Sequence, residues 1–146
     1  MRISYKGDYA LKAMLDLALH YDIELVTGHD LAKRIDAPVK FLEQVLLELR
    51  KGGFIESRRG NIGGYMLSRG PVKISVGEVV RYIDGPIEPI ACINEKYSNC
   101  LDVNRCVFKK LWNKVYEATT SIIDNVTFEA LASEVNVNKQ ALAYSI

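Results

Sequence analysis

The chain has 146 residues, 49% of them hydrophobic, which is the size of one domain with an extension and enough apolar content for a packed core. The formal net charge of +1 excludes a uniformly basic nucleic-acid-binding protein, so any contact with DNA must come from a local basic patch. The apolar runs are too short to cross a bilayer and the first residues lack a secretory segment, so we expect a cytoplasmic protein without membrane contact.

Three helices are predicted in the first half by apolar residues that recur every three or four positions. The first covers residues 8–20, and Asp8 stands where a helix N-cap would. The second is short and covers 30–35. The third follows Pro38, which suits a first helical position, and a pair of glycines ends it after Lys51.

A glycine-rich turn, RRGNIGGY (58–65), joins two predicted strands at 54–57 and 65–68. Three helices followed by a hairpin is the order of a winged helix-turn-helix, a mainly α fold with a small β-hairpin. In that fold the second helix of the helix-turn-helix pair enters the major groove and the hairpin forms the wing. The predicted DNA-binding residues lie on that helix and on the wing: Val39, Lys40, Glu43, Gln44, Arg58, Arg59 and Gly60.

The polar residues among these have a chemical reason for contacting DNA. Gln44 can pair with adenine, Glu43 can accept from cytosine N4, and Lys40 can reach a phosphate or guanine. Arg58 and Arg59 can bind phosphates or an adjoining minor groove. The plainer alternatives are a polar helix surface and solvated turn charges. The hairpin and its flanks carry five basic residues and one acidic residue, which favours the DNA-binding interpretation.

The second half of the chain opens with a capping box, in which Ser75 is followed by Glu78. The helix that begins there ends at a Gly-Pro pair, and an aperiodic segment follows. A long helix then has apolar residues on more than one face. We expect four parts: a DNA-binding domain (1–85), a cysteine loop (86–106), a long helix with a short capping helix (107–134) and a loose tail (135–146).

The three cysteines, Cys92, Cys100 and Cys106, all lie in the aperiodic loop among polar residues. An odd number in a cytosolic chain argues for metal or redox chemistry and against a disulfide framework. Their spacing is too wide for a zinc knuckle and is compatible with an iron–sulfur cluster, while zinc and unliganded thiols are the alternatives. His20 and His29 are distant in sequence, so a carboxylate or solvent would complete a cluster unless folding brings a histidine over.

Four stretches resemble the Rrf-type winged-helix transcriptional regulators: MRISYKGDYAL, FLEQVLLELRKGGFIES, RRGNIGGY and VGEVVRYIDGPIEPIAC. The resemblance covers residues 1–132. It implies a homodimer in which the long helix crosses its partner, and binding to double-stranded promoter DNA at a two-fold-related site. It also implies that Cys92, Cys100 and Cys106 hold a [2Fe–2S] or [4Fe–4S] cluster. The wide apolar surface of the long helix independently favours a dimer.

The cysteine pattern differs among members of this family. IscR-like members have a shorter first interval and a histidine after the third cysteine, and this chain has neither; its interval is more similar to RirA-like members. In NsrR-like members an aspartate of the other subunit completes the cluster, and that position matches Asp8, for which a plain N-cap is the alternative.

We therefore expect a transcriptional regulator, not an enzyme, whose cluster senses iron, cluster supply, or nitric oxide and redox stress. The alternatives are a cluster-free or zinc-binding repressor with a thiol switch and, from another class, a small redox enzyme.

Overall fold

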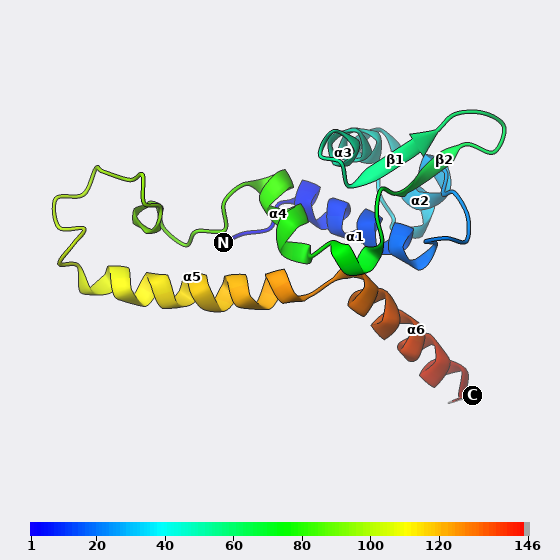
Figure 1. Ribbon diagram of the computed structural model, residues 1–146. Coiled ribbons are helices and arrows are strands. Elements are labelled where there is room, and N and C mark those ends of the chain that lie inside the picture. The colour runs from blue at the N-terminus through cyan, green and yellow to red at the C-terminus, as the bar shows by residue number, and fades with distance from the viewer. Residues whose placement is uncertain (145–146) are drawn as a thin grey trace.

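The computed structural model describes residues 1–144 and divides into a compact head and two projecting helices (Figure 1). The head contains α1 (Tyr5–Leu19), α2 (Gly28–Arg34), α3 (Val39–Lys51), β1 (Ile55–Arg58), β2 (Gly64–Leu67), a short 3-10 helix η1 (Pro71–Lys73) and α4 (Val76–Asp84). The cysteine loop with a second 3-10 helix, η2 (Ala91–Ile93), follows, and then α5 (Val107–Asn125) and α6 (Phe128–Tyr144). This order confirms the predicted mainly helical winged-helix fold.

The hydrophobic core is built around α1. One face of α1 buries Ala10, Ala13, Met14 and Leu17, and α3 turns its apolar stripe toward that face. Helix α4 covers another side, and α6 adds Phe128, which is fully buried, from its first turn. The head is therefore a packed unit to which α6 contributes only at its start.

The hairpin is a two-stranded antiparallel sheet in which Ile55 pairs with Leu67 and Arg58 with Gly64. Its second strand is also held by the segment before α2, because the Tyr65 N–H donates to the Val26 carbonyl at 2.7 Å and Val26 N–H donates back at 3.0 Å. A Cβ on Gly64 would come within 2.7 Å of that carbonyl oxygen, so glycine is needed there. The base of the hairpin is thus fixed to the head.

The start of α1 differs from the sequence prediction. The helix begins at Tyr5 rather than Asp8, and Ser4 is the N-cap, accepting a hydrogen bond from the Gly7 N–H at 2.9 Å. Asp8 lies one turn inside the helix, so the N-cap interpretation of Asp8 is wrong. At α3, Pro38 is the N-cap and Val39 the first helical residue, one position later than predicted.

The predicted tail is also wrong over most of its length. Helix α6 continues to Tyr144, where the sequence predicted a short helix followed by a loose tail from 135 to 146. Its second half includes Lys139, Gln140, Ala141 and Leu142, which are strong helix formers and sustain the helix without a buried face. Residues 145–146 lie outside the described residues.

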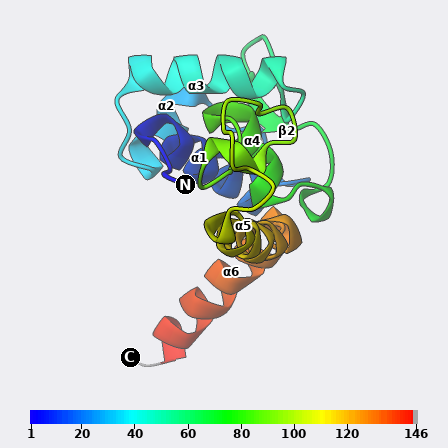
Figure 2. The same ribbon diagram turned by 90° about the vertical axis from the view of Figure 1, so that its left-hand side faces the viewer.

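The two C-terminal helices lie away from the hairpin. Figure 2 shows α5 nearly end-on beneath the head, with α3 across the opposite side. Helix α4 is joined to α5 by Arg81, whose guanidinium contacts the Asp124 carboxylate at 2.6 Å and 3.0 Å. Among residues 1–144, none of the helices has the length and apolar character needed to span a membrane.

Candidate DNA-reading face and cysteine loop

Helix α3 presents a polar face outward because its apolar residues follow a helical period. Leu42, Val45, Leu46 and Leu49 are buried against the head. The opposite side exposes the four residues predicted to contact DNA: Val39, Lys40, Glu43 and Gln44. The structure therefore gathers these four on one accessible surface at the N-terminal half of the helix, where a recognition helix meets base edges.

The position of α3 is set by α2 and the turn between them. Asp36 adopts a left-handed conformation with φ of 53°, which aspartate tolerates, and reverses the chain toward α3. Helix α2 is held to α1 by Arg34, whose Nε donates to Asp16 Oδ2 at 2.7 Å. Asp16 is only 6% exposed, and its hydrogen bond raises the pKa of Arg34. Sequence analysis missed this pair, because nothing local to either residue indicates the other.

The wing projects beyond the head on the same side as α3 (Figure 1). Arg58 ends β1, and Arg59 and Gly60 begin the turn; all three are exposed. Within residues 1–144, neither arginine forms an ion pair or a side-chain hydrogen bond, whereas nearby Arg69 contacts Glu78 at 3.2 Å. Two unpaired cations beside an exposed polar helix face form the local basic patch that DNA contact requires.

The cysteine loop is irregular, as predicted, and carries no disulfide. Cys92 lies in η2, Cys100 in an extended stretch, and Cys106 at the N-cap of α5 without a side-chain capping bond. All three thiols are partly exposed, and no residue from 88 to 106 is buried. The loop therefore has little packing to hold it in one conformation.

Within residues 1–144 the fold does not bring three His, Cys, Asp or Glu side chains close enough to hold a metal ion. Both histidines belong to the head: His29 is exposed on α2, and the His20 ring lies 3.3 Å from Asp16. Neither histidine joins the cysteines in a ligand group. The structure thus keeps the predicted ligands on one mobile-chemistry segment, the loop, without assembling them in a single chain.

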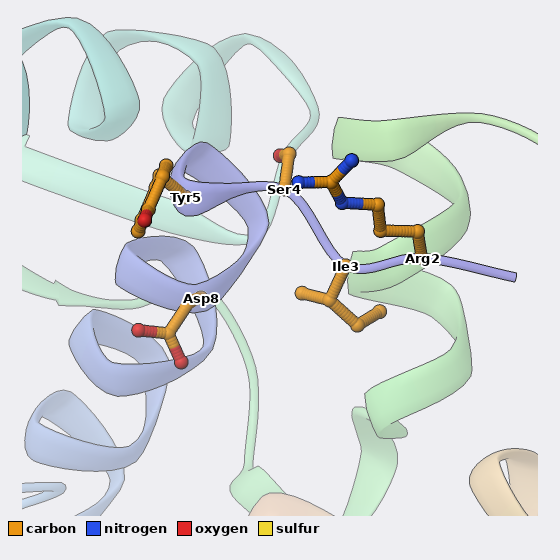
Figure 3. A pocket seen from close by; sticks show the side chains of 5 residues that line it. All are labelled: Arg2, Ile3, Ser4, Tyr5 and Asp8. Carbon is orange, nitrogen blue, oxygen red and sulfur yellow. The ribbon is translucent and has the colours of Figure 1, made fainter.

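Asp8 faces an open pocket of about 690 Å³ at the start of α1. Figure 3 shows Tyr5 and Asp8 projecting from the helix on one side, with Arg2 and Ile3 on the strand that precedes it. The Asp8 carboxylate accepts from Lys12 Nζ at 2.6 Å, which raises the pKa of Lys12. Both side chains are about half exposed, so the carboxylate remains accessible to another chain.

These features define a class of protein: a winged-helix DNA-binding regulator with a cysteine-bearing segment next to the DNA-reading head. The profile of the Rrf2 family, described as "Iron-dependent Transcriptional regulator", matches residues 3–134. The chain belongs to the Rrf2 family.

Relatives of known name agree with this assignment. An rrf2-like HTH-type regulator of Rhodobacter capsulatus is 37% identical over 92% of this chain and 94% of its own, and IscR of Yersinia pseudotuberculosis is 34% identical over 94% and 82%. Among solved structures, CymR, the global cysteine regulator of B. subtilis, superposes with a TM-score of 0.78 at 30% identity over 92% of this chain and 98% of its own. IscR of T. potens gives 0.72 at 30% identity over 92% and 88%. The chain is thus a transcriptional regulator and not an enzyme.

Proposed function

We propose that this regulator binds promoter DNA as a homodimer and that an iron–sulfur cluster in the cysteine loop controls the binding. Residues 1–85 would read DNA, 86–106 would sense the signal, and the segment from 107 onward would join two copies. The observation that carries the proposal is the loop itself, which holds three free thiols and follows directly from the head.

The case for a second copy rests on α5. None of its 19 residues is buried in the single chain. Four large apolar side chains with spacings of three, four and seven form an exposed stripe: Phe108 (62% exposed), Leu111 (49%), Val115 (38%) and Ile122 (65%). An amphipathic helix buries such a stripe against a partner. A second α5 offers the same stripe and completes a two-fold interface, which two DNA half-sites require.

The donor chemistry of the loop fits a cluster. Cysteine thiolates are the usual ligands of iron–sulfur centres, and Cys92, Cys100 and Cys106 are unpaired and partly exposed. A segment without buried residues can close around a ligand with little loss of packing. When bound, a cluster supplies a centre whose assembly and oxidation respond to iron, oxygen and nitric oxide. The three thiolates would hold it and order the loop.

Asp8 of the other subunit is the residue we assign as a further ligand. Its carboxylate is accessible and belongs to the first turn of α1, so it would link the head of one chain to the loop of the other. Losing that link would free both heads together, which is a two-state change driven by a ligand. Operator affinity would then depend on whether the loop is ordered.

The cluster is tested on protein made and kept without oxygen. We expect brown protein with about one acid-labile sulfide per iron. Alanine at Cys92, Cys100 or Cys106 should remove the colour and leave the helical circular dichroism unchanged. Ser98→Ala, in the same exposed loop, is the matched control and should stay brown. Colourless anaerobic protein that contains zinc would overturn the proposal.

A thiol switch is the second candidate, favoured by the free cysteines and by the likeness to the cysteine regulator CymR. Oxidation by peroxide would remove two hydrogens from two thiols to form a disulfide, while the peroxide is reduced to water. Metal-free protein whose DNA affinity changes on peroxide treatment and returns with dithiothreitol would support this alternative over the cluster.

A further inference from the structure

The tip of the wing carries an isoleucine that the fold does not use. Ile62 is 88% exposed. Together with Asn61 it occupies the centre of a β-turn, closed by the hydrogen bond from Gly63 N–H to the Gly60 carbonyl at 3.1 Å. Such positions are usually Gly, Asn, Asp or Ser, for which the turn itself gives a reason. The turn gives no reason for an isoleucine.

The turn holds Ile62 in a defined place. Gly60 has a φ of 121°, which other residues rarely adopt. A Cβ on Gly63 would lie 2.6 Å from the Arg58 carbonyl oxygen, so the chain closes tightly there. Behind the turn, β2 is fixed to Val26 by two hydrogen bonds. Ile62 is therefore displayed on a structured projection.

The surroundings of Ile62 indicate what it meets. Arg58 and Arg59 stand behind it, exposed, and neither has an ion-pair partner in the part of the chain that the structure describes. The wing and α3 project on the same side of the head (Figure 1). When α3 lies in a major groove, the wing is next to the sugar–phosphate backbone and the adjoining minor groove. Arginines together with a protruding apolar residue are typical of elements that enter that groove.

We propose that Ile62 enters the minor groove beside the α3 contact and makes the wing select A·T pairs there. The walls of this groove are sugars, against which an aliphatic side chain can pack. On its floor, a G·C pair adds the guanine N2 amino group, a donor that isoleucine cannot satisfy after displacing its water. An A·T pair has no such donor. This inference rests on the DNA-binding part of the proposed function and not on the cluster.

The test uses duplexes that differ only in the minor groove. Binding sites are first selected from a random pool with the wild-type protein, and hydroxyl-radical footprinting locates the steps under the wing. Affinities are then measured for duplexes with A·T, G·C or inosine·C at those steps, because inosine lacks the amino group of guanine. The proteins are wild type, Ile62→Gly and the conservative Ile62→Val.

We expect wild type and Ile62→Val to prefer A·T to G·C by about ten-fold, and inosine·C to restore most of the affinity. Ile62→Gly should reduce the preference to about two-fold or less while keeping its dependence on the bases under α3. Wild type that binds G·C and inosine·C equally, or Ile62→Gly with the full preference, would overturn the inference.

Each protein is measured both metal-free and after anaerobic cluster assembly. If the two preparations of wild type bind DNA equally, cluster control fails, and the comparison among Ile62 variants is still decided.

Discussion

The backbone N–H of Ser4 donates to Asp84 Oδ2 at 2.9 Å, and the Ser4 hydroxyl contacts Oδ1 of the same carboxylate. Asp84 is the last residue of α4, where a negative charge opposes the dipole of its own helix. Beside the N-terminus of α1 the same charge is favourable, and this contact explains its position. Because the cysteine loop begins just after Asp84, the contact connects that loop to the first turn of the head.

Gly7→Ala should reveal how tightly this contact is packed. Alanine normally stabilises a helix interior by about 1 kcal/mol relative to glycine. Here the new Cβ would overlap Asp84 Oδ2, so we expect a loss of about 1–3 kcal/mol in the free energy of unfolding. In an Asp84→Ala background the same substitution should be neutral or stabilising. Urea denaturation at one protein concentration measures both, and equal effects in the two backgrounds would contradict the packing argument.

Asp8→Ala separates the ligand role of Asp8 from its contact with Lys12. The N-cap is Ser4, so we expect little change in thermal stability. The cluster should become more labile, and the DNA affinities of the cluster-bound and metal-free forms should converge. Lys12→Ala is the matched control, since it removes the same ion pair and keeps the carboxylate. If Asp8→Ala keeps the wild-type difference between the two forms, the further ligand is another residue.

Arg58→Ala and Arg59→Ala should each make DNA binding less dependent on salt. A lost phosphate contact lowers the slope of log affinity against log salt by about one per head, hence about two per dimer. Fluorescence anisotropy at four or more salt concentrations gives the slope. Lys139→Ala on α6, away from α3 and the wing, should leave it unchanged. Arginine variants with the wild-type slope would show that the wing charges are only solvated.

Leu111→Glu should convert the dimer to a monomer, because it places a charge in the exposed stripe of α5. Sedimentation velocity gives the mass directly. Lys110→Glu is the control, since the exposed Lys110 lies about 100° further around the helix, outside the stripe. The monomer should keep the fold of the head and lose most of its affinity for a two-fold site. A dimeric Leu111→Glu protein would exclude this stripe as the interface.

The sequence predicted the features that depend on local signals. The capping box of Ser75 and Glu78 is present, with the Glu78 carboxylate accepting from the Ser75 N–H at 2.8 Å. The exposed face of α3 followed from its period. The start of α1 could not be predicted, because Ser4 is stabilised by a residue 80 positions away. The arrangement of the cysteines was equally out of reach, since an irregular loop has no period and the proposed partners belong to another chain.

The stripe on α5 and the DNA-reading face lie on different sides of the molecule, which has a genetic consequence (Figure 2). A chain with a damaged α3 or wing would still pair with an intact chain, and the mixed dimer would have one working head. In cells that carry both alleles, such variants should interfere with the wild type. Variants of the stripe, such as Leu111→Glu, should be recessive, because they never enter a mixed dimer. Reporter expression in cells carrying both alleles would distinguish the two groups.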